Sequence, residues 1–150
     1  MASRRKEIVD FIVTQLKNID GQTSTYKASY TYNHNLFENV YRKLKFLDEV
    51  NDFPALYVSA GTEFRNFNSK SLTVATLDVT IRAYVYGEDD SQSQADDLVQ
   101  DVEHVIYSLE DSPDKGILDI TIDNISTDEG LAIPYGLAEI ELTIVYRLDG

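Results

Sequence analysis

An alternation of apolar and polar side chains in residues 77–86 is the feature that most constrains the fold of this chain. Leu77, Val79, Ile81, Ala83 and Val85 alternate with Asp78, Thr80, Arg82, Tyr84 and Tyr86. Successive side chains of a β-strand point to opposite faces, so this spacing predicts a long strand with one buried face. A sheet that contains this strand must bury its apolar face against other elements of the fold.

Four further stretches are predicted as strands. Residues 118–123 and 138–148 show the same alternation, and residues 55–60 form a short apolar run that Gly61 closes. Residues 39–47 also alternate, although a short helix that begins near Leu36 is an alternative there. Pro54 is expected at the start of a strand, because proline cannot donate a hydrogen bond to a sheet ladder.

Two amphipathic helices are expected to provide the cover. Residues 3–19 repeat apolar side chains at helical spacing, and Gly21 ends this helix. A second helix begins at Ser91, which can form a capping box with Gln94, and ends at Ser112-Pro113. Its apolar stripe consists of Ala95, Leu98, Val102, Val105, Ile106 and Leu109.

The remaining segments are expected to be connections. Residues 22–35 are either a loop or a poorly packed strand, residues 62–70 a long hairpin loop, and residues 128–136 a second long loop. The order α-β-β-β-α-β-β predicts an α+β fold, a mostly antiparallel sheet with two helices packed on one face. With 150 residues, the chain is expected to form a single domain, 1–150.

The charge of the chain is unevenly distributed. It has 13 Lys and Arg residues against 26 Asp and Glu residues, a net charge of −13, and beyond Arg82 only Lys115 and Arg147 accompany 17 acids. Such a chain repels phosphate backbones and anionic lipids, so we expect no membrane partner and no tight electrostatic binding of nucleic acid. The acids are interleaved with apolar residues and are interpreted as solvated faces of folded elements, with a purposeful negative surface as the alternative.

The sequence offers no arrangement typical of catalysis. His34 and His104 are the only histidines, neither has a metal-ligand spacing, and there is no cysteine. The carboxylate pairs fall in turns and at helix caps, and residues 123–130 carry Ile125 where a calcium loop needs a ligand. We therefore expect no catalytic residue, no cofactor and no metal site.

Aromatic and basic residues are better candidates for contact surfaces. Tyr84 and Tyr86 are expected on the outer face of the longest strand, where they either pack beneath a loop or across the sheet, or belong to a subunit interface. Basic residues of the first part could meet acids of a neighbouring copy, and contact between unlike surfaces builds rings. The interface candidates are Arg42, Lys43, Phe64, Arg65, Phe67, Arg82, Tyr84 and Tyr86.

Several segments together resemble the tail terminator, or tail completion, proteins of long-tailed bacteriophages. They are the amphipathic N-terminal helix, residues 48–56 leading into a strand, the strand end Tyr84-Val85-Tyr86-Gly87, and the acidic helix after Ser91. The run from Ser126 through Pro134 and Glu139 to Tyr146 also fits. The resemblance covers nearly the whole chain.

This resemblance implies a structural virion protein, assembled in the host cytoplasm. Such proteins form a hexameric ring on the tail tube, stop tube polymerisation and join the tail to the head connector. The implied partners are further copies of the chain, the tail tube protein, a connector or neck protein and a tail sheath. Viral DNA would pass through the ring without specific binding. The concentration of acids beyond Arg82 adds the hypothesis of an acidic lumen, for which the candidates are Glu88, Asp89, Asp90, Asp128 and Glu129.

Three other functions are alternatives to this one. Another ring protein of the neck or head–tail connector would have the same kind of sequence. An acidic protein that mimics DNA is supported by the net charge alone. An enzyme is disfavoured because no site constellation is present.

Overall fold

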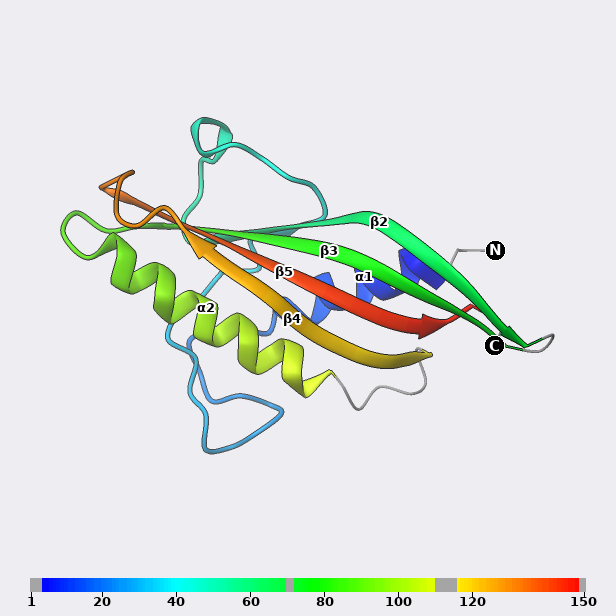
Figure 1. Ribbon diagram of the computed structural model, residues 1–150. Helices are drawn as coiled ribbons and strands as arrows, with labels where there is room; N and C mark the ends of the chain where they lie inside the picture. The colour runs from blue at the N-terminus through cyan, green and yellow to red at the C-terminus, as the bar shows by residue number, and fades with distance from the viewer. Residues whose placement is uncertain (1–3, 70–71, 110–115, 149–150) are drawn as a thin grey trace.

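The computed structural model describes residues 4–69, 72–109 and 116–148 (Figure 1). Within these ranges the chain forms two α-helices, five strands and a short 3₁₀ turn. In chain order they are α1 (Arg4–Leu16), β1 (Val40–Tyr41), η1 (Leu47–Glu49), β2 (Ala55–Ser69), β3 (Leu72–Tyr86), α2 (Ser91–Ser108), β4 (Ile117–Thr127) and β5 (Tyr135–Arg147).

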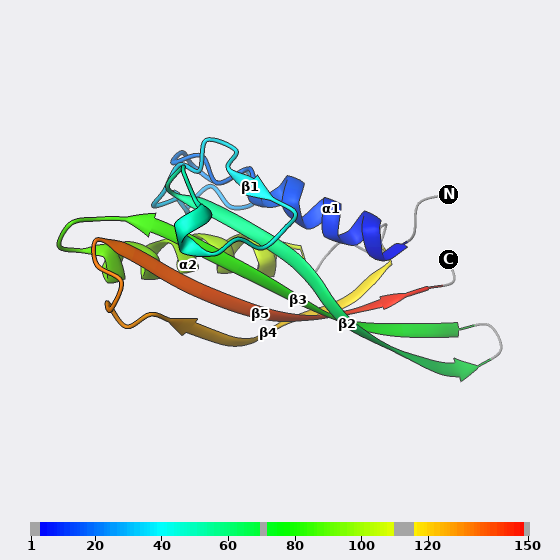
Figure 2. The ribbon, with the colours of Figure 1, turned by 90° about the horizontal axis from the view of Figure 1, so that it is seen from above.

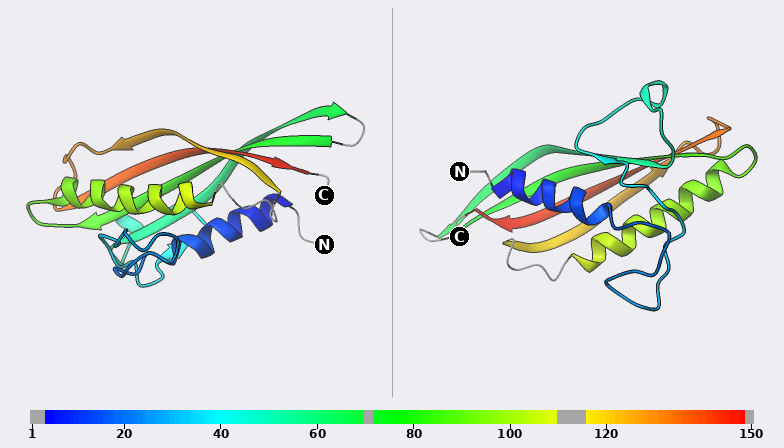
Figure 3. Two further views of the ribbon diagram at one scale, coloured as in Figure 1. Left: turned by 90° about the horizontal axis from the view of Figure 1, so that it is seen from below. Right: turned by 180° about the vertical axis from the view of Figure 1, so that it is seen from behind.

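The strands form one sheet in the order β1-β2-β3-β5-β4. Strand β1 is parallel to β2, and the other neighbours are antiparallel. Both helices lie on the same side of this sheet (Figure 3, left). The α+β class, the element order and the mostly antiparallel sheet with helices on one face are therefore confirmed.

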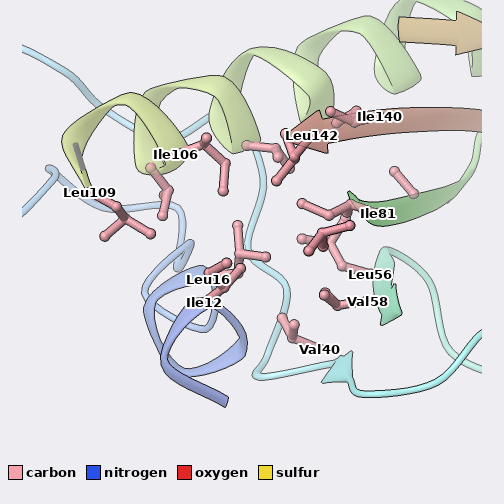
Figure 4. Close-up of a cluster of buried hydrophobic side chains, with 14 of the residues drawn as sticks. Ile12, Leu16, Val40, Leu56, Val58, Ile81, Ile106, Leu109, Ile140 and Leu142 are labelled. Carbon is pink, nitrogen blue, oxygen red and sulfur yellow. The ribbon is translucent and has the colours of Figure 1, made fainter. Parts of the chain in front are cut away.

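The main core lies between the helices and the sheet (Figure 4). Ile12 and Leu16 of α1 and Ile106 of α2 are buried there with Ile81 and Leu142 of the sheet. All the apolar residues of the predicted alternation, Leu77, Val79, Ile81, Ala83 and Val85, belong to this core. The strict period of β3 thus arises because one of its faces lies against helices and the other does not.

The prediction of a loop at residues 62–70 is wrong. Strand β2 continues to Ser69, and β3 begins at Leu72 rather than Leu77. Glu63 pairs with Leu77 and Phe64 with Thr76, so the two strands form a long hairpin that projects beyond the rest of the sheet (Figure 2). Backbone pairing with β3 holds this segment, and a hairpin that projects past the helices has little apolar periodicity to reveal it.

The predicted strand at 39–47 is also much too long. Only Val40 and Tyr41 pair with β2, and neither a nine-residue strand nor a helix from Leu36 is formed. Residues 22–35 contain no strand, only isolated bridges such as Thr23 with Thr31. Helix α1 ends at Leu16 and α2 at Ser108, and the expected stop at residues 112–113 lies outside the described residues.

A second, smaller core lies on the sheet face opposite the helices. Val50, Ala55, Tyr57 and Tyr84 are buried in it. The segment of residues 42–54, with η1 within it, covers these side chains, and Leu47 and Phe53 pack against them. This segment, which we call the covering loop, leaves the rest of that sheet face open.

Candidate interaction surfaces

The eight predicted interface residues do not form one patch. Phe64, Arg65 and Phe67 lie on the projecting part of β2, and Arg42 lies in the covering loop next to α1. Lys43, Arg82 and Tyr84 gather around the covering loop, and Tyr86 lies at the opposite end of the sheet from the hairpin tip. The predicted interface residues are thus divided between the hairpin, the covering loop and the end of β3 at Tyr86.

The projecting hairpin carries an exposed aromatic side chain on one face and an ion pair on the other. Phe64 is 63% exposed. On the other face of β2, the guanidinium of Arg65 donates to Glu63 at 2.8 Å, and the Tyr146 hydroxyl also donates to Glu63. Burial acts to raise the pKa of Glu63, but the hydrogen bonds from Tyr146 and Arg65 outweigh it and hold that pKa below its ordinary value.

The two explanations for Tyr84 and Tyr86 separate in the structure. Tyr84 is buried beneath the covering loop, and its hydroxyl donates to the carbonyl oxygen of Lys45. The ring of Tyr86 is half exposed and lies edge-on to that of Tyr135. Tyr84 therefore packs under a loop within its own chain, whereas Tyr86 packs across the sheet on Tyr135, and its place in a subunit interface stays a prediction.

An open pocket of about 320 Å³ lies between the covering loop and strands β4 and β5. Arg82 lines this pocket. Its guanidinium lies 3.3 Å from the carboxylate of Glu139 and 5.9 Å from the ring centroid of Phe46. Lys43 of the covering loop lies 5.9 Å from the ring centroid of Tyr41 in β1. Of these contacts, only that of Arg82 with Phe46 joins the covering loop to the central strands, and each is of the kind worth about 1 kcal/mol or less at exposed sites.

The predicted acidic residues come together at one end of the sheet. Glu88, Asp89 and Asp90 form the turn from β3 to α2, and Asp128 and Glu129 begin the loop from β4 to β5. The backbone N–H of Gly87 donates to Pro134 at 2.8 Å and ties the two segments together.

The same acidic end carries two exposed apolar side chains. Leu131 is 87% exposed and Ile133 58%. Asp128 shapes their loop, because its carboxylate accepts hydrogen bonds from the backbone N–H groups of Ala132 at 2.9 Å and Leu137 at 3.3 Å. This end therefore offers a surface that is both acidic and apolar.

Asp101 is a structural residue that the sequence did not reveal. It lies on α2 and is fully buried, whereas the acids of that helix were interpreted as a solvated face. Its carboxylate accepts hydrogen bonds from the Tyr30 hydroxyl at 2.7 Å and from the backbone N–H groups of Asn33 and His34 at 2.9 Å each. Burial raises the pKa of Asp101, and these three hydrogen bonds act in the opposite direction. Its position between Gln100 and Val102 gave no signal, because its partners lie almost 70 positions away.

His104 lies in an aromatic cluster rather than on an open surface. Its ring stacks on that of Tyr30 with centroids 4.1 Å apart, and its Nε2 lies 2.6 Å from the Ser24 hydroxyl. Burial lowers the pKa of His104. The hydrogen bonds of Asp101 go to Tyr30, Asn33 and His34, so this Ser, His and Asp set lacks the geometry of a nucleophilic triad and instead anchors residues 22–35 to α2.

Comparison with known proteins assigns the chain to a family. The family described as "Bacteriophage Tail Tube Terminator Protein" matches residues 2–149. The tail tube terminator protein p142 of Escherichia phage T5 is 35% identical over 127 residues, which cover 77% of this chain and 79% of that protein. A chain from the virion of a native gene transfer agent particle aligns with a TM-score of 0.43 and 15% identity, over 75% of this chain and 79% of its own length.

No helix among the described residues is long and apolar enough to cross a membrane. The resemblance found in the sequence is confirmed, and with it a structural role in the phage virion. The chain belongs to the family of bacteriophage tail tube terminator proteins.

Proposed function

We propose that six copies of this chain form a ring on the end of the tail tube, stop its polymerisation and join the tail to the head connector. The match to tail tube terminator proteins along residues 2–149 is the observation that carries this proposal. The two unlike ends of the sheet support it. Identical copies in a ring present the same end on the same side, so one side would show the acidic end and the other the hairpin.

The acidic end is proposed to surround one mouth of the channel through which viral DNA passes. Glu88, Asp89, Asp90 and Glu129 are exposed there and Asp128 is partly exposed, as a charged rim requires. Six copies would carry a net charge of six times −13. Repulsion of the phosphate backbone would let DNA slide without being held.

Capping of tubes provides the direct test. Purified chain is added to polymerising tail tube protein, and tube lengths and tube ends are imaged by negative-stain electron microscopy. We expect shorter tubes with a ring-shaped density on one end. Tubes of unchanged length with bare ends would refute the proposal, whereas a chain that is monomeric before tubes are added would not, because rings can close on a template.

The channel proposal has a separate test. Replacing Glu88, Asp89 and Glu129 together by lysine puts a basic rim in place of the acidic one. We expect capping to persist and the rings to retain DNA fragments at moderate salt, which the unmodified rings release. A matched triple change to glutamine removes charge without adding any and should not retain DNA. Equal DNA release by all three rings would place the channel mouth elsewhere.

A further inference from the structure

We propose that neighbouring copies join through their sheets, with β4 of one copy beside the projecting part of β2 in the next. This inference rests on the ring of the proposed function. Strand β4 is the last strand of the sheet, and β1 covers only Leu56 and Tyr57 of β2. Among the described residues, the rest of the β2 edge and the outer edge of β4 have no strand partner.

The directions of the strands suit such a joint. Strands β2, β3, β5 and β4 alternate in direction across the sheet, so β4 runs opposite to β2. In a cyclic ring all copies have the same orientation relative to the axis. Therefore β4 of one copy meets β2 of the next as an antiparallel pair, the pairing that already joins β2, β3, β5 and β4 within the chain.

The lengths and heights of the two edges also correspond. When paired residues are followed from β2 across β3 and β5 to β4, Arg65 lies in the same row as Ile117. Leu56 lies in the same row as Thr127. The 11 residues of β4 therefore span the height of β2 from Leu56 to Arg65. Closing a sheet requires a stagger between strands, and a shift toward Ser69 would place β4 along the projecting hairpin.

Each edge carries an exposed apolar side chain. Leu118 on β4 is 51% exposed, and Phe64 is exposed on the projecting part of β2. The charged residues of the two edges do not face each other, because Asp119 pairs with Val145 on the outer face of the sheet, whereas Arg65 lies on the helix side and is bound to Glu63. Backbone pairing and apolar contact, rather than charge, would therefore hold the joint.

Strand β4 carries two acidic residues and two bulges, which can discourage pairing at an edge, but residues 117–127 contain no lysine or proline. The strand has register shifts near Asp119 and near Asn124. Such bulges bend a sheet, and a closed ring of joined sheets needs that curvature.

Engineered cysteines can test the joint, because the chain has none of its own. Thr121→Cys and Asn124→Cys in β4 are each combined with Asn66→Cys in β2, all at exposed positions, and rings assembled on tubes are treated with a short bismaleimide. The double variant should give a covalent ladder that ends at the ring. A mixture of the two single variants should stop at dimers, and each single variant alone should give none.

The controls separate the joint from the ring itself. Asp96→Cys, on the exposed side of α2, combined with Asn66→Cys should give no ladder. The pair Asp119→Lys and Asp123→Lys places lysines on the β4 edge and should weaken ring formation at least tenfold, whereas Asp96→Lys with Asp97→Lys should leave it unchanged. Ring formation is compared at equal folded fraction, because Asp123 also accepts a hydrogen bond from Thr143. Rings that form but do not crosslink from β4 to β2 would overturn this inference alone. Tubes left uncapped by the unmodified chain would overturn the proposed function and the joint with it.

Discussion

Replacing Asp101 by asparagine is expected to destabilise the chain by about 2–3 kcal/mol. The carboxylate is fully buried and accepts three hydrogen bonds, and bonds to a charged group contribute about 1.5–3 kcal/mol each. An asparagine side chain keeps one oxygen, which can still accept from the Tyr30 hydroxyl and the Asn33 N–H. Its NH₂ group would face the N–H of His34, so one bond is lost and two donors oppose each other. Relief of the buried charge offsets part of this loss.

Thermal unfolding followed by circular dichroism measures the effect. For a chain of 150 residues, 1 kcal/mol shifts the unfolding temperature by about 2–4 °C, so we expect a decrease of about 4–12 °C. Asp96→Asn is the matched control, because that side chain is exposed on the same helix and should change stability by less than about 0.5 kcal/mol.

Hydrogen exchange locates the loss. The amides of Asn33 and His34, which donate to Asp101, should exchange faster in the variant, because the segment of residues 22–35 is released from α2. Amides in β3 and β5 should exchange faster only by the amount that the loss of global stability accounts for. An Asp101→Asn variant as stable as the control, with unchanged exchange at Asn33 and His34, would refute the role given to this carboxylate.

Other predictions concern Glu63 and two glycines. Because the folded pKa of Glu63 is lowered, its contribution to stability is present above its ordinary pKa and lost as the pH falls through the folded value. In denaturant titrations, Tyr146→Phe should therefore cost about 1–2 kcal/mol at pH 7 and less in acid, once the pH falls through the lowered pKa of Glu63. An equal cost at both pH values would contradict this. Gly136→Ala should cost about 1–3 kcal/mol, because the new Cβ would lie 2.4 Å from the Ser91 carbonyl oxygen. Gly61→Ala, with its nearest atom at 3.6 Å, should fold normally, and equal thermal stability of the two would refute the packing argument.

The parts of the fold that the sequence predicts are those in which one face is buried against another element. Strand β3 alternates because Leu77 and Ile81 lie against helices, and α2 shows its stripe because Leu98 and Ile106 face the sheet. The same rule explains the missed hairpin. Beyond Glu63 the strands project past the helices, so Phe64 is exposed, no face is apolar, and polar residues resemble a loop.

The sequence predicts the acidic end of the sheet, but it does not predict the burial of Tyr84 or the role of Asp101. The acids at 88–90 and 128–129 are brought to one end because strand ends meet in any antiparallel sheet, so the topology placed them together. The burial of Tyr84 depends on the covering loop, whose path no periodic pattern reveals. Asp101 depends on three donors from residues 30–34, and a single sequence contains no information on such a distant contact.

The separation between acidic end and sheet edges explains how so acidic a chain could assemble with copies of itself. An 11-residue strand spans roughly 37 Å, several times the Debye length of about 8 Å at physiological salt. Charges at Glu88 to Asp90 are therefore screened from most of the proposed joint between β4 and β2. Assembly would depend on backbone pairing and apolar contact along these edges, whereas the net charge of −13 would act on what passes the channel mouth. Added salt should accordingly leave the joint nearly unchanged and weaken the repulsion of DNA.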